Sequence, residues 1–109
     1  MDINECFLRG RIGQDFKFAK TKDAREFATF SIAINNIASR IWDKTAHDNI
    51  VYLRIMVFDT RLVQYLHKVN AKANDMVNVF ARLNSHKVNQ KGVEYSQIDI
   101  VANDISIIK

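Results

Sequence analysis

Apolar and polar residues alternate along most of the chain, and this period of two is typical of β-strands. A helical spacing interrupts it once, in residues 59–69. The chain therefore predicts three strands, one helix and then two more strands. The five alternating segments are "ECFLRGRI" (5–12), "FATFSIAIN" (27–35), "VYLRIMVF" (51–58), "MVNVFARL" (76–83) and "IDIVANDISII" (98–108).

The predicted helix begins behind Asp59 or Thr60, either of which is a suitable N-cap. Its Tyr65 and Lys68 are expected at the surface. Its core-facing side chains are Leu62, Val63, Leu66 and Val69. A small all-β protein must close or cover the edges of its sheet, and a barrel with a helix across one end does so. We therefore predict an all-β OB-fold, a five-stranded Greek-key barrel with one helix between strands three and four.

One face of each predicted strand forms the core. Gly10 inside the first strand predicts a bulge or a tight bend, and Gly92 marks the turn of a long hairpin over residues 84–97. The length of 109 residues predicts a single domain over residues 1–109. The expected interior residues are Cys6, Leu8, Gly10, Ile12, Ala28, Phe30, Ile32, Ile34, Val51, Leu53, Ile55, Val57, Val77, Val79, Ala81, Leu83, Ile98 and Ile100.

The third strand has an unusual second face, because its outward residues are not simply polar. They are Tyr52, Arg54, Met56 and Phe58. Single-stranded nucleic acid needs flat rings on which unpaired bases stack, and cations that follow the phosphates. Aromatic residues interleaved with arginine supply both, and a formal net charge of +4 agrees with a polyanionic partner.

Further rings and cations lie on the strand 76–83, on the hairpin and in the segment 36–49, which has no regular period and is long for a connection between strands. Because such residues match the needs of an unpaired strand, we predict a nucleic-acid interface. Its candidate residues are Trp42, Tyr52, Arg54, Met56, Phe58, Phe80, Arg82, Arg40, Lys44, Lys87, Lys91 and Arg11.

Structural alternatives exist for several of these residues. Tyr52 and Phe58 fit a second small core or a subunit contact as well as base stacking. Arg11, near Phe7, fits a solvated or subunit-contacting face better than a line of cations that contacts phosphates. For Lys87 and Lys91 on the hairpin, phosphate contact and general surface charge are equally good interpretations. A tryptophan between two cations in a polar segment favours a functional role for Trp42.

Catalysis finds no support in the sequence. The three histidines are scattered, no glycine-rich phosphate loop is present, and Asp43 and Asp48 lack further ligands for a metal. We expect neither an enzyme nor a cofactor or metal. Because Cys6 is the only cysteine and no segment has the layout of a signal peptide or a membrane span, we expect a cytoplasmic protein that does not enter a membrane.

The chain resembles the bacterial single-stranded DNA-binding protein family along its whole length. The resemblance implies an OB-fold that wraps single-stranded DNA during replication, recombination and repair, close to the nucleoid. It also implies a homotetramer built as a dimer of dimers, with a dimer as the alternative. The segments that carry it are "FLRGRIGQD", "FATFSIAIN", "VYLRIMVFDTRLVQYLHKV", "MVNVFARLNSHK" and "DIVANDISII".

By position, the resemblance assigns base stacking to Tyr52 and Phe58, a basic contact to Arg54, and a stacking role to Trp42 in the loop after strand two. The chain departs from the family at two points. Val88 stands where the hairpin often carries an aromatic residue, and Asp59 stands where a glycine commonly follows strand three. The resemblance therefore implies one stacking platform fewer than usual.

Family members generally carry a flexible tail with an acidic tip that recruits repair enzymes, whereas this sequence stops at "ISIIK". We expect either a chain cut after the barrel or a short phage, plasmid or divergent member, without recruitment through a tail. Two rival functions remain: a tailless replication-restart accessory protein of the same fold, and an OB-fold used only for protein interaction. The sequence does not separate DNA from RNA as the ligand.

Overall fold

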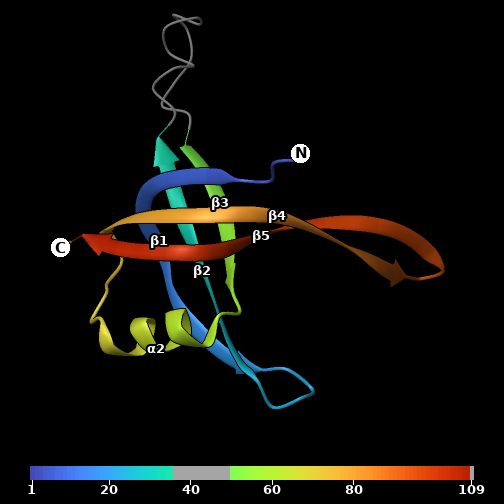
Figure 1. Cartoon of the computed structure of the whole chain (residues 1–109), viewed down its shortest axis with the longest axis horizontal. Coiled ribbons are helices and arrows are strands. Elements are labelled where there is room, and N and C mark those ends of the chain that lie inside the picture. Colours follow the sequence, from blue (N-terminus) through green and yellow to red (C-terminus); the bar gives the residue numbers. More distant parts are fainter. Residues whose placement is uncertain (36–49, 109) are drawn as a thin grey trace, which may run out of the picture.

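The computed structural model describes residues 1–35 and 50–108, without the side chain of Asp15. The strands close into a barrel in the order β1-β2-β3-β5-β4, with the helix lying across one end (Figure 1). Neighbouring strands are antiparallel except β3 and β5, which are parallel. The predicted OB-fold is confirmed. Its elements are β1 (Cys6–Lys20), β2 (Glu26–Asn35), β3 (Ile50–Val57), α2 (Thr60–Lys68), β4 (Met76–Gln90) and β5 (Val93–Ile108).

The barrel interior is filled by the alternate side chains that the sequence predicts, and Ile32, Ile55 and Val79 are completely buried. The prediction of burial is wrong for three residues, because Val51, Leu83 and Ile98 are exposed. Leu83 and Ile98 lie where β4 and β5 begin to leave the barrel, so no opposing sheet covers them. Ile100 packs against the core as expected.

Strand β1 pairs with two neighbouring strands. Its first half pairs with β4 and its second half with β2, with register shifts between Ile12 and Gln14 and between Gln14 and Lys17. The bulge predicted at Gly10 therefore falls after Ile12 instead, and Gly10 is regularly paired with Val77. Gly10 is required for another reason, since a Cβ there would lie 2.6 Å from the carbonyl oxygen of Ala33.

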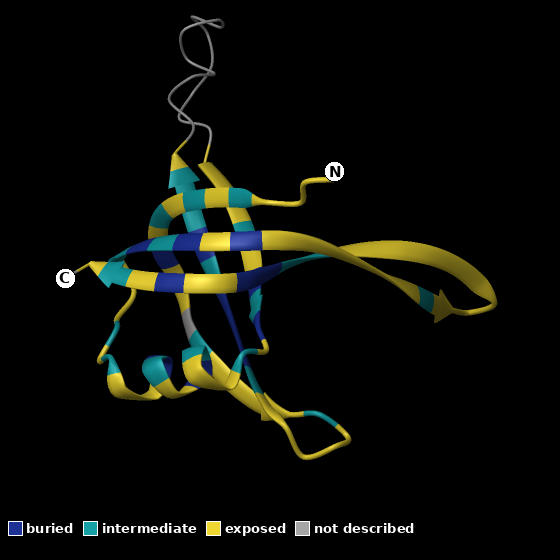
Figure 2. Ribbon diagram, in the orientation of Figure 1, coloured by how far each residue is buried: buried dark blue, intermediate teal, exposed yellow. Residues whose placement is uncertain are grey.

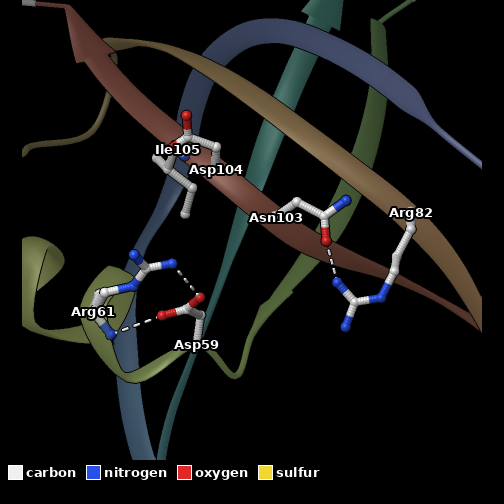
Figure 3. Close-up of polar contacts among 6 residues, drawn as sticks. All are labelled: Asp59, Arg61, Arg82, Asn103, Asp104 and Ile105. Carbon is white, nitrogen blue, oxygen red and sulfur yellow. Dashed lines mark hydrogen bonds and ion pairs between the residues drawn. The ribbon is translucent and has the colours of Figure 1, made fainter.

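Helix α2 begins at the predicted cap. The carboxylate of Asp59 accepts a hydrogen bond of 2.8 Å from the Arg61 amide, and this bond, helped by the Arg61 side chain, lowers the pKa of Asp59 (Figure 3). Val63 and Leu66 are buried in the barrel end. Tyr65, expected at the surface, is half-buried: its hydroxyl accepts a hydrogen bond of 3.1 Å from the Ile107 amide and its ring packs against the core.

Beyond the barrel, β4 and β5 continue as a largely exposed two-stranded ribbon, residues 83–99, which we call the hairpin arm (Figure 2). It turns as predicted at Gly92. Lys91 (φ 54°) and Gly92 (φ 81°) both adopt left-handed backbone conformations, as a two-residue type I′ turn requires. This turn sets the register of the whole arm, starting from the pair Gln90 and Val93.

The parallel seam of the barrel is short. In the described part of the chain, β3 and β5 are paired at Ile55 with Ile100 and at Met56 with Val101. The other neighbouring strands are joined over longer ladders. No helix among the described residues is long and apolar enough to cross a membrane.

Candidate nucleic-acid interface

The outer face of β3 carries the side chains that the alternation predicts. Tyr52 is 68% exposed, Arg54 is exposed, and Met56 is half-buried. Phe58 follows the last residue of β3, is exposed, and has its ring centroid 5.7 Å from that of Phe27. The strand therefore presents one open ring, one guanidinium group and one thioether in a row.

Three adjoining hollows surround Arg54, and we call them together the β3 groove. One, of about 400 Å³, lies between β3 and the hairpin arm, and Tyr52, Arg54 and Met56 line it on the β3 side. A second, also of about 400 Å³, extends from Tyr52 and Arg54 across β2 to Gln14. The third, of about 280 Å³, continues from Arg54 to Lys17 on β1. The groove thus crosses β1, β2 and β3 and reaches the arm.

The groove offers stacking and charge together. Tyr52 supplies a ring, Arg54 and Lys17 supply cations, and Gln14 and Ser31 supply polar groups along the floor. This is the face of the OB-fold, over strands two and three, that generally receives oligonucleotides. Stacking on an exposed ring contributes about 1–3 kcal/mol per base, whatever the base is.

Other predicted residues lie on a different face. Phe80 stacks on Phe7, with centroids 4.6 Å apart and the rings inclined at 21°, and both line a hollow of about 500 Å³ on the outside of β1 and β4. Arg82 donates to Asn103 (Figure 3), and Arg11 donates to the carbonyl of Asn74 at 3.0 Å. Phe80, Arg82 and Arg11 do not line the β3 groove, so the structure divides the predicted residues between two surfaces.

The predicted lysines of the hairpin both lie on the arm. Lys87 forms an ion pair of 3.4 Å with Glu94, and both side chains are exposed. Lys91 occupies the turn itself. Arg40, Trp42 and Lys44 lie outside the described residues. The residues that flank their segment, Asn35 and Ile50, are paired with each other at the Tyr52 end of β3.

Several residues of this surface escaped the sequence analysis. Val88 stands where the resemblance leads us to expect an aromatic residue on the hairpin. Tyr95, which is exposed, lies directly opposite Val88 on β5. Counting back from a two-residue turn at Lys91 and Gly92 would have paired these two positions. His86, Gln97 and Asp99 line the hollow between β3 and the arm, and no sequence motif marks them. Gln14 was missed because β1 is longer than expected.

Comparison with known proteins agrees with this geometry. The sequence profile of the single-strand binding protein family matches residues 3–108. Comparison with curated protein sequences gives no significant match. This family consists of DNA-binding proteins without enzymatic activity.

Solved structures share the fold over the whole chain. A Plasmodium falciparum single-stranded DNA-binding protein, solved in complex with single-stranded DNA, is 22% identical with a TM-score of 0.79, covering 100% of this chain and 97% of that one. The mitochondrial single-stranded DNA-binding protein Rim1 of S. cerevisiae is 21% identical with a TM-score of 0.73, covering 100% and 98%. With the profile match over nearly every residue, the chain belongs to the single-strand binding protein family.

Proposed function

We propose that this protein coats and protects single-stranded DNA through the β3 groove, largely independently of sequence, during replication, recombination and repair. It acts in the nucleoid-associated cytoplasm as a binding protein and not as an enzyme. The observation that carries the proposal is the open ring of Tyr52 beside Arg54, in a groove that continues from β1 to the hairpin arm. The DNA-bound Plasmodium relative supports it.

In this mechanism, bases stack on Tyr52 while Arg54 and, farther along the groove, Lys17 contact the phosphates. Met56 offers an apolar contact beside the ring. Tyr95 on the arm provides a further stacking surface. The flanking residues that complete the proposed interface are Phe58, Lys87, Lys91, Arg40, Trp42 and Lys44.

Titration of the protein with a fluorescently labelled oligo-dT tests this function. We expect tight binding at low salt that weakens as salt rises, because cations on the protein displace counterions from the strand. If three cations contact phosphates, the slope of log K against log salt is about −2. A duplex of equal length should bind much more weakly. Absence of binding at low salt, or binding indifferent to salt, would overturn the proposal.

The second surface supports an assembly, which we propose to be a homotetramer. Phe7 and Phe80 are both about half exposed and form one stacked apolar patch on the outside of β1 and β4. An exposed stacked pair of this kind is typical of a surface that another subunit covers. Because side chains alternate along a strand, Arg11 lies on the Phe7 face of β1 and Arg82 on the Phe80 face of β4.

Phe80→Asp should lower the mass measured by sedimentation equilibrium from tetramer to dimer or monomer, because it places a charge in the proposed contact. Val93→Asp is the matched control, since Val93 is exposed at the tip of the hairpin arm. It adds the same charge and should leave the mass unchanged. A Phe80→Asp protein that keeps its full oligomeric mass would refute this assembly surface.

A further inference from the structure

The hollow between β3 and the hairpin arm contains an acidic side chain. Asp99 lines it together with Tyr52 and Arg54, and the Asp99 side chain is only 19% exposed. A carboxylate repels phosphates, so Asp99 cannot contribute to binding by contacting the sugar-phosphate backbone of the nucleic acid. Its place beside the stacking ring suits a contact with the edge of a base.

The carboxylate of Asp99 is held in a fixed orientation. The Nδ1 atom of His86 lies 2.9 Å from one carboxylate oxygen, Oδ2. A carboxylate accepts hydrogen bonds at both of its oxygens, so the contact with His86 leaves acceptor capacity for another donor. His86 and Asp99 come from neighbouring strands of the arm, whose register is set by the turn at Lys91 and Gly92.

We propose that Asp99 selects among bases stacked in this hollow, favouring those that carry an exocyclic amino group over thymine. Cytosine presents its N4 amino group as a donor, whereas thymine presents the O4 acceptor at the same position. A carboxylate attracts the first and repels the second. This inference rests on the proposed binding of single-stranded DNA, and it differs from the usual expectation that such proteins read no base edges.

The test compares oligo-dT with oligo-dC of equal length, at one salt concentration and at pH 8. The quantity measured is the ratio of Kd for oligo-dT to Kd for oligo-dC. The two strands differ in intrinsic flexibility, but this difference affects the ratio equally for every protein variant, so a change in the ratio reports on the protein. Asp99→Asn should lower this ratio about fivefold to tenfold, since an amide both accepts and donates and therefore discriminates less.

Glu94→Gln is the matched control. Glu94 is an exposed acidic residue on the same arm, outside the hollow, and its substitution removes the same charge. It should strengthen binding of both oligonucleotides alike and leave the ratio unchanged. An unchanged ratio in Asp99→Asn would overturn the inference while leaving the proposed function standing. If the unaltered protein bound neither oligonucleotide, the proposed function would fail, and this inference with it.

A second measurement needs no protein variant. Oligonucleotides in which 2-pyrimidinone replaces cytosine keep the ring but lack the N4 amino group. The unaltered protein should bind them about fivefold to tenfold more weakly than oligo-dC, because the carboxylate loses its donor. Equal affinity for the two would refute a contact between Asp99 and the amino group.

Discussion

Tyr52→Ala should weaken binding of single-stranded DNA about tenfold to hundredfold, which corresponds to one lost stacking contact of about 1–3 kcal/mol. Tyr52 is the most exposed ring on the outer face of β3, and it lines two of the three hollows of the β3 groove. Removal of the ring leaves Arg54 and Lys17 in place. We therefore expect the salt dependence of binding to persist while the affinity falls. Titration with labelled oligo-dT at several salt concentrations measures both.

Tyr52→Phe is the control for this experiment, because it keeps the ring and removes only the hydroxyl. It should bind nearly as well as the unaltered protein. The outcome that contradicts the prediction is a Tyr52→Ala protein with unchanged affinity and a changed oligomeric mass. That result would favour the rival function, in which the outer face of β3 is buried in a protein contact.

Gly10→Ala should lower the free energy of unfolding by about 3 kcal/mol, the upper end of the range for overpacked interiors. The added Cβ would lie 2.6 Å from the carbonyl oxygen of Ala33 and 3.0 Å from a side-chain carbon of Ile34. The first of these atoms is backbone in the adjoining strand β2, so it cannot move aside without disturbing the barrel ladder. Urea denaturation followed by circular dichroism measures the change.

Gly92→Ala gives the comparison, because it separates crowding from backbone strain. A Cβ at Gly92 would meet no atom within 4 Å, but the residue has φ +81°. Its substitution should cost about 1 kcal/mol, from the left-handed conformation alone. If the two substitutions destabilised the protein equally, close packing would not explain the glycine at position 10.

The fold could be predicted from the sequence because period-two alternation and one helical segment fix the number and order of the elements. Two of the three errors in the core occur where alternation continues beyond the barrel. Leu83 and Ile98 keep the pattern of a core face, but the hairpin arm has no sheet opposite it, so both are exposed. Periodicity identifies the face of a strand on which a side chain lies. It does not reveal where the neighbouring layer ends.

The candidate site was predicted in part for a related reason. Alternation correctly places Tyr52, Arg54 and Phe80 outside the barrel. A closed barrel has outer faces all around it, however, and sequence alone does not say which residues share one. Phe80 stacks on Phe7 over β1 and β4, away from the β3 groove. Asp99 was not foreseen, because its neighbours in space come from β3 and β4 and no motif joins them.

The short parallel seam between β3 and β5 connects closure of the barrel with binding of a ligand in the hollow between β3 and the hairpin arm. Among the described residues, β3 and β5 are paired only at Ile55 and Met56, over a shorter length than the other neighbouring strands. The hollow with Tyr52 on one side and Asp99 on the other spans that junction. A ligand held there bridges the two strands and stabilises the closed form by mass action. Without a ligand, this junction is held by fewer strand pairings than its neighbours, so we expect local opening to begin there.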